Sequence, residues 1–249
     1  MATLATTKFG VAVMRKLLLL IGLLVMPLSV SAQNVGFFAA VGRLELAGKG
    51  FCTATLIGPE LVLTAAHCLY DKQNGARFDV GQLEFKAGYQ QGISIASAGV
   101  SRVAIHPEYD VRKKGEMNNL RFDLALLQLD KAIENQTVKP IEVANPDLSG
   151  RTVGVMSYGA GRAENPQLES ACAIKTRPEG IFITTCKAHH GSSGAPVLQI
   201  IKGRAQLVSV VSAMARANGK PVALAAAPKE DLGKLKRELS KTYVAELKE

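Results

Sequence analysis

Between residues 35 and 226, hydrophobic residues occur in short runs that are rich in β-branched or alternating positions. Gly, Pro, Asn and Asp separate these runs, and helical periodicity is nearly absent. This pattern predicts the short strands of an all-β sandwich or barrel. No run repeats at a fixed period, which argues against a propeller or solenoid. The clearest expected strands cover residues 51–57, 61–64, 78–85, 124–129, 152–157, 180–185, 195–201 and 206–213.

The pattern changes after Pro228. Leucine and tyrosine side chains then recur every three or four residues among Lys, Arg and Glu, which predicts an amphipathic helix. Acids and bases alternate on its polar face, so we expect it to pack on the protein rather than on a membrane surface. The residues that set this period are Leu232, Leu235, Leu239, Tyr243 and Leu247.

The first 32 residues have the pattern of an export signal. Two basic residues precede an apolar run over 17–26, and small residues end at Ala32, where we expect cleavage. The apolar run is too short to span a membrane comfortably, so no stable membrane anchor is expected. The chain should therefore be secreted or periplasmic. Met14 could begin a conventional leader by itself, so both Met1 and Met14 remain candidate starts of translation.

Composition narrows the possible functions. The 249 residues are 47% hydrophobic but only 5% aromatic, with no Trp, so the core must consist mainly of aliphatic side chains. The formal charge of +9 falls to +6 when the three basic residues of the leader are removed. Lys and Arg are scattered and no aromatic residues lie between them, so nucleic-acid binding is not expected. No acidic loop suggests calcium, and no cofactor is expected.

The chain has four cysteines, which can pair in three ways. In an exported protein they are expected to form disulfides. We expect Cys52 to pair with Cys68 and Cys172 with Cys186, because each pair lies on neighbouring strand-like runs that a hairpin could join. A zinc site is not favoured, because neither a C-x-x-C nor an H-E-x-x-H motif is present.

Two segments contain residues suited to nucleophilic catalysis. A serine hydroxyl becomes a useful nucleophile when a base lies within hydrogen-bond reach and a third group orients that base. His67 ends an apolar strand and precedes Cys68, which could fix the turn covalently. Ser193 lies in G-S-S-G-A-P, where small residues leave the N–H groups of Gly191 and Ser193 available to an oxyanion. Taken singly, a buried structural histidine and a flexible turn would be the simpler interpretations.

The combination of motifs resembles a known family. T-A-A-H-C, F-D-L-A-L-L-Q-L and G-S-S-G-A-P, in this order, are similar to the signature blocks of trypsin-like (chymotrypsin-fold) serine proteases. The resemblance implies two six-stranded antiparallel β-barrels, over residues 33–145 and 146–227, with the active site between them and a C-terminal α-helix over 228–249. It also implies a monomeric enzyme that acts on protein or peptide substrates. His106, in I-H-P-E-Y, resembles a structural position of the family.

The same resemblance assigns catalytic roles. Ser193 would attack the peptide bond, His67 would act as its base and Asp123 would orient His67, so that hydrolysis proceeds through an acyl-enzyme. Many relatives also pair a newly freed amino terminus with an Asp just before the nucleophile. This chain has Ser192 at that position, which resembles bacterial members that lack this ion pair. Removal of the signal could then be the only cleavage required.

Candidate specificity residues follow from the alignment of these motifs. Without a gap, Lys187 occupies the floor of the primary pocket, where its ammonium would favour an acidic side chain; if the register shifts, Lys187 faces solvent. Met214 would narrow the pocket entrance and His190 would lie at its rim. Ser212 would support the triad, and the backbone of Ala213 would pair with the substrate. A trypsin-like preference for basic residues is not expected.

Two other functions compete with the serine-protease hypothesis. An α/β-hydrolase esterase requires G-x-S-x-G and a histidine after the serine, but Ala195 replaces the last glycine and no histidine follows Ser193. A protease-like binding module with little or no turnover stays open, because a fold by itself does not establish activity. Covalent labelling of Ser193 separates this module from an active enzyme.

Overall fold

The computed structural model describes residues 36–145, 152–176 and 180–246. The predicted leader, residues 1–32, therefore lies outside the described residues. Strands dominate the described chain, in agreement with the all-β prediction. The strands are β1 (Val41–Leu46), β2 (Phe51–Gly58), β3 (Leu61–Thr64), β4 (Leu83–Ala87), β5 (Ala96–Ile105), β6 (Ala125–Leu129), β7 (Glu142–Val143), β8 (Val153–Gly159), β9 (Arg162–Cys172), β10 (Ile174–Thr176), β11 (Ile181–Thr184), β12 (Pro196–Ile201), β13 (Arg204–Ala217) and β14 (Lys220–Ala226).

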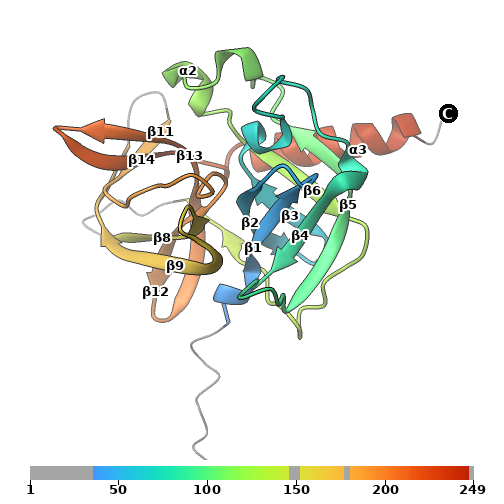
Figure 1. Cartoon of the computed structure of the whole chain (residues 1–249), viewed down its shortest axis with the longest axis horizontal. Helices are drawn as coiled ribbons and strands as arrows, with labels where there is room; N and C mark the ends of the chain where they lie inside the picture. Colours follow the sequence, from blue (N-terminus) through green and yellow to red (C-terminus); the bar gives the residue numbers. More distant parts are fainter. Residues whose placement is uncertain (1–35, 146–151, 177–179, 247–249) are drawn as a thin grey trace, which may run out of the picture. The chain divides into compact units, whose positions relative to one another are not determined.

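Strands β1 to β6 form a closed antiparallel barrel in the order β1-β2-β3-β6-β5-β4 (Figure 1). In a closed barrel, side chains that face the interior alternate with side chains that face outward. Strand β4 has this pattern, because every second side chain is buried and the intervening ones are less so. The strand predicted over 78–85 begins later than expected. Asp79 accepts a hydrogen bond from the Gly81 N–H at 3.1 Å, which caps a 3-10 turn at Val80–Gln82 and delays β4 until Leu83.

The remaining strands form a second sheet in the order β10-β11-β14-β13-β12-β8-β9, and β7 pairs with β13. In the described residues this path ends at β10 and β9, whereas the resemblance implied a second closed barrel of six strands. The predicted fold class is confirmed: the described chain has one closed β-barrel, a second β-sheet and a C-terminal helix. Figure 1 shows the two β bodies side by side.

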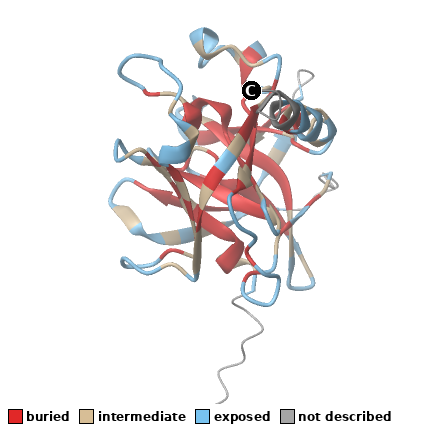
Figure 2. Ribbon diagram, turned by 90° about the vertical axis from the view of Figure 1, so that its right-hand side faces the viewer, coloured by how far each residue is buried: buried red, intermediate tan, exposed pale blue. Residues whose placement is uncertain are grey.

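Buried aliphatic side chains hold these elements together. Figure 2 shows that the buried residues are concentrated in the central strands, whereas the outer loops are mostly exposed. The largest cluster fills the barrel and extends to residues of the second sheet such as Met156 and Leu198. Helix α3 (Leu232–Glu246) buries Leu235 and Leu239 in this same cluster, as its period predicted. The described helix starts at Leu232, four residues after the predicted beginning.

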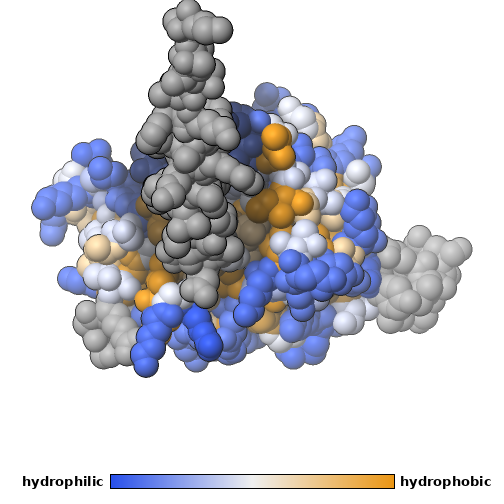
Figure 3. All heavy atoms as spheres, turned by 90° about the horizontal axis from the view of Figure 1, so that it is seen from below, coloured by the Kyte–Doolittle hydropathy of each residue, from blue (hydrophilic) through white to orange (hydrophobic). Residues whose placement is uncertain are grey.

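The surface is mixed in character. Figure 3 shows hydrophobic areas bordered by hydrophilic residues on one face. Among the described residues, the exposed large hydrophobic side chains are Ile93, Ile95, Ile200 and Met214. None of the helices in the described part of the chain is both long and apolar enough to cross a membrane.

Candidate active site

A cavity of about 250 Å³ receives side chains from both β bodies. The barrel contributes a histidine and two lysines, and the second sheet with its loops contributes the rest. Of the sequence-predicted site residues, the structure brings five side chains and one backbone segment to this cavity. Its lining residues are His67, Lys72, Lys114, Ala188, His189, His190, Ser193, Val211, Ser212, Ala213 and Met214.

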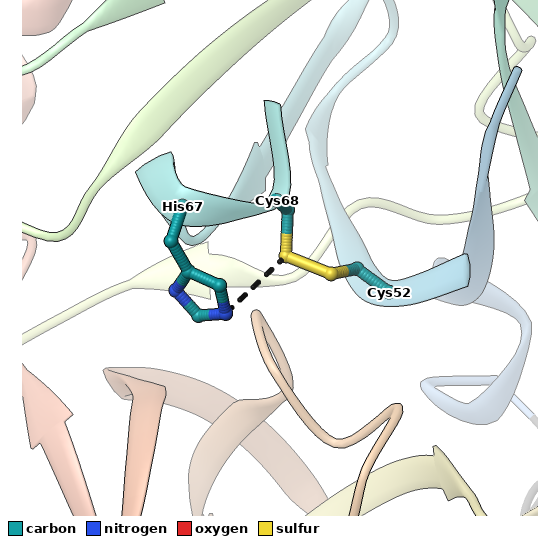
Figure 4. A group of neighbouring side chains, drawn as sticks. All are labelled: Cys52, His67 and Cys68. Atoms are coloured by element: carbon teal, nitrogen blue, oxygen red, sulfur yellow. Dashed lines mark hydrogen bonds between the residues drawn. A yellow bond between two sulfur atoms is a disulfide. The ribbon is translucent and has the colours of Figure 1, made fainter. Parts of the chain in front are cut away.

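His67 lies in a 3-10 turn, Ala66–Leu69, directly after β3. The neighbouring Cys68 is joined to Cys52 of β2 by a disulfide, which ties this turn to the barrel. Figure 4 shows the imidazole beside that disulfide, with Nε2 at its near edge, 4.0 Å from Cys68 Sγ. Only 4% of His67 is exposed. The predicted pairing of Cys52 with Cys68 is confirmed, and so is that of Cys172 with Cys186.

Asp123 stands just before β6 and contacts His67 twice. Its carboxylate accepts the His67 backbone N–H at 2.8 Å, and its other oxygen lies 2.7 Å from His67 Nδ1. The Ser212 hydroxyl donates to that second oxygen. Burial acts to raise the pKa of Asp123, but the charge of His67 and hydrogen bonds from His67 and Ser212 outweigh it, so the pKa lies below its ordinary value. The carboxylate thus stays ionised and fixes the imidazole with Nδ1 protonated.

Ser193 lies in the turn that connects β11 to β12. Its carbonyl accepts the Thr53 N–H at 2.9 Å, while the Gly194 N–H donates to the Val211 carbonyl at 2.8 Å. The turn is therefore anchored to the barrel on one side and to the second sheet on the other. Within the described residues, no hydrogen bond joins Ser193 to His67, although both line the cavity. Hydrogen bonds at catalytic groups are often looser without substrate.

In the described part of the chain, two backbone N–H groups at or near Ser193 are free to donate. The N–H groups of Gly191 and Ser193 take part in no hydrogen bond among the residues that the structure describes. Gly191 has a φ of +96°, a left-handed conformation that glycine adopts without strain. The Ser192 N–H that lies between these two donors is bonded to the His189 carbonyl at 2.9 Å.

The neighbouring Ser192 is fully buried and stabilises this turn. Its Oγ accepts the His189 N–H at 3.1 Å and lies 3.1 Å from Ser157 Oγ and 3.2 Å from the Tyr158 carbonyl. A neutral serine with local partners can therefore hold the turn in shape.

Gly194 is packed so closely that the site depends on it. Its φ is +79°, and a Cβ atom there would collide with Thr64 Oγ1 and the Thr53 carbonyl. Gly219, in the turn between β13 and β14, has nearly the same φ, +75°, but open space around it. We expect Gly219→Ala to lower the free energy of unfolding by about 1–2 kcal/mol, from backbone strain alone.

Gly194→Ala should cost about 4 kcal/mol or more, because the buried backbone must also move. Urea denaturation of both variants measures this difference. Equal losses in the two variants would contradict the packing around Gly194.

The wall contributed by the second sheet contains His190, Ser212, Ala213 and Met214. Met214 is 48% exposed, so its side chain stands at the entrance rather than in the protein interior. Lys187, in contrast, is exposed and is not among the residues that line the cavity. Its backbone N–H donates to Glu169 of β9 at 2.8 Å.

The Cys172–Cys186 disulfide explains the position of Lys187. It joins Cys186, the residue before Lys187, to Cys172 at the end of β9. Lys187 is exposed in the structure, as in the alternative with a shifted register, and its place at a pocket floor stays a prediction of the ungapped register.

His106 has no part in the cavity. It is buried, stacks on Phe122 with ring centroids 4.9 Å apart, and its Nε2 lies 3.2 Å from Asp231 Oδ1, just before α3. This placement agrees with the structural position predicted for it. His106 thus packs the C-terminal helix against the segment that carries Asp123.

Sequence reasoning missed Lys72, Lys114 and His189. All three lie in loops, where no hydrophobic period indicates which way a side chain faces. The closeness of Lys72 to His67 in the sequence was the one available signal, since a residue five positions beyond a predicted base can reach the same cavity.

Three atoms near the cavity could in principle bind a metal. The ligand atoms of Cys52, His67 and Cys68 lie within 4.8 Å of one another. The two sulfur atoms are bonded to each other, however, so neither is the thiolate that a metal would require (Figure 4). His67 alone remains as a ligand, which does not make a metal site.

Comparison with known proteins identifies the family of this chain. The model of the family described as "Trypsin" matches residues 29–227, which is most of the sequence. The chain belongs to the trypsin family. The resemblance drawn from the three sequence blocks is thereby confirmed.

The individual relatives either have low sequence identity to this chain or align with less than half of it. Trypsin of Saccharopolyspora erythraea is 33% identical over 103 residues, which cover 41% of this chain and 40% of that protein. Glutamyl endopeptidase of Bacillus licheniformis is 24% identical over 171 residues, 68% of this chain and 52% of that protein. The chain thus spans about half or less of the length of these curated relatives.

A solved structure of a Glu endopeptidase in complex with MPD has the same fold. It superposes with a TM-score of 0.67 at 19% identity and covers 85% of this chain and 95% of that one. At this identity the likeness supports the fold and nothing finer.

Proposed function

We propose that this trypsin-family chain is a secreted serine endopeptidase with Ser193 as nucleophile, His67 as general base and Asp123 as the residue that orients His67. The observation that carries the proposal is the His67–Asp123 pair, which opens into the same cavity as Ser193. A nucleophile, a base and a third group that orients the base are the parts required for acyl transfer.

In the first half of the reaction, His67 accepts the Ser193 proton as Oγ attacks the substrate carbonyl. His67 then gives this proton to the leaving amine, and an acyl-enzyme remains. In the second half, His67 activates a water molecule, which releases the acid product and regenerates Ser193. Asp123 keeps its negative charge throughout and stabilises the imidazolium that forms in each half.

The N–H groups of Gly191 and Ser193 would bind the oxyanion of the tetrahedral intermediate. Because they are fixed in place before reaction, they stabilise the developing charge without reorganisation, an effect of roughly 3–4 kcal/mol per donor. The hydrogen bonds of Ser192 and the packing of Gly194 maintain this geometry. No cofactor enters any step.

Export is part of the proposal. The two disulfides are typical of an oxidising compartment, where a secreted or periplasmic protein folds. Cleavage of residues 1–32 as a signal would deliver the chain there, with protein or peptide as substrate and the monomer as the active form.

Cleavage after Arg or Lys is not expected. Among the described residues that line the cavity there is no carboxylate, whereas Lys72 and Lys114 are cationic. A positively charged substrate side chain would therefore lack a partner and meet like charge. Profiling with a peptide library tests this expectation: cuts should occur mainly after residues other than Arg and Lys. A profile dominated by Arg and Lys would refute it.

A further inference from the structure

Two lysines from separate loops of the barrel lie beside the candidate base. Lys72 follows the turn that carries His67, and Lys114 belongs to the loop between β5 and β6. Both are exposed, and both line the cavity together with His67 and Ser193. The barrel side of the cavity is therefore positively charged.

Neither ammonium group has an ion-pair partner among the described residues. Two carboxylates in the same loops already have partners: Asp71 is bound by Lys49 Nζ at 2.5 Å, and Asp110 by the Arg112 guanidinium at 2.9 Å. The buried Asp123 is committed to His67 and Ser212. Among the described residues, therefore, no ion pair neutralises these two ammonium groups.

The two lysines also influence each other. Desolvation lowers the pKa of Lys114, the positive charge of Lys72 lowers it further, and the Asp123 carboxylate acts in the opposite direction. Two like charges held close together destabilise the free protein, and an anion placed between them relieves that repulsion. This is the electrostatic arrangement of a site for a carboxylate.

The position of the lysines indicates which part of a substrate they would meet. Ala213 and Met214 of β13 form the opposite wall, and an extended peptide would lie between the two walls. Successive side chains of an extended peptide point to opposite sides. If the residue whose carbonyl is attacked points toward the second sheet, each of its two neighbours points toward the barrel.

We propose that Lys72 and Lys114 form a subsite for an acidic side chain on a residue next to the one whose carbonyl is attacked. The inference rests on the proposed endopeptidase function and adds a substrate feature to it. The subsite would select peptides with Glu or Asp immediately before or immediately after the cleaved residue, whichever amino acid the primary pocket accepts.

Matched peptides that differ only by Glu or Gln at one position test the subsite. The pairs vary the residue before the cleaved one, the cleaved residue itself and the residue after it. We expect kcat/KM to be roughly five- to thirty-fold higher for Glu than for Gln at one neighbouring position, since two exposed charges act at short range. The preference should diminish as salt is added.

Variants assign the preference to these two residues. In K72Q/K114Q the Glu/Gln ratio should fall to about one, and in K72E/K114E a peptide with Lys at that position should become the better substrate. K113Q, which removes an exposed lysine next in sequence but outside the cavity lining, is the matched control and should keep the full ratio.

A binding assay separates failure of the subsite from failure of the proposed function. Titration of fluorescent Glu and Gln peptides into Ser193→Ala protein measures the same preference without turnover. Equal affinities for the two peptides, or a Glu preference that survives in K72Q/K114Q, would overturn the subsite. If the Glu preference in binding depends on both lysines but no peptide is hydrolysed by the unmodified protein, the subsite stands and the endopeptidase proposal fails.

Discussion

Replacing Ser193 with alanine is expected to lower kcat for peptide hydrolysis by roughly 10⁶-fold, because the acyl-enzyme forms on Ser193 and the other serine hydroxyl of the cavity, Ser212, donates to Asp123. The substitution removes one oxygen and should leave the fold intact, since the Ser193 backbone carbonyl still accepts the Thr53 N–H. Hydrolysis of a fluorogenic peptide measures the loss, and KM should change far less than kcat.

The matched control is Ser240→Ala on helix α3, where an exposed hydroxyl donates only to the Lys236 carbonyl. This variant should retain full activity. Residual hydrolysis of more than about one per cent in pure Ser193→Ala protein would show that another residue is the nucleophile.

Asp123→Asn should reduce kcat by roughly 10⁴-fold. The carboxylate accepts hydrogen bonds from His67 Nδ1, the His67 backbone and Ser212. An asparagine amide placed against Nδ1 would donate to it instead, so the proton would move to Nε2 and the ring could no longer accept one from Ser193. The loss should appear in kcat, measured with the same fluorogenic peptide.

Asp130→Asn provides the comparison, because Asp130 is an exposed aspartate at the other end of β6. Its activity should match that of the unmodified protein, and thermal melting of both variants checks that each is folded. Less than a tenfold loss in folded Asp123→Asn protein would contradict the orienting role.

Much of the fold was predictable because strands and helices leave periodic patterns. The runs at 51–57 and 61–64 correspond to β2 and β3, and the leucine period after Pro228 corresponds to α3. The two disulfides were predictable from the neighbouring runs that they join. In each case local sequence determines the direction in which side chains face.

The start of β4 and the positions of several cavity residues depend on loops. Hydrophobic periodicity does not predict which way a side chain in a loop faces. The predicted strand over 78–85 was shortened by the Asp79 cap. Lys187, which an ungapped alignment places at the pocket floor, is exposed in the loop next to the Cys172–Cys186 disulfide. Lys72 and Lys114 became recognisable as neighbours only when the folded loops brought them to one cavity.

The most direct test of the account is covalent labelling of the mature protein with a fluorophosphonate probe, followed by mass-spectrometric mapping of the modified residue. The account predicts a single modified peptide with the label on Ser193, labelling that is lost in Ser193→Ala, and labelling that is strongly slowed in Asp123→Asn. A folded protein that leaves Ser193 unlabelled, or that carries the label on another serine, would contradict it.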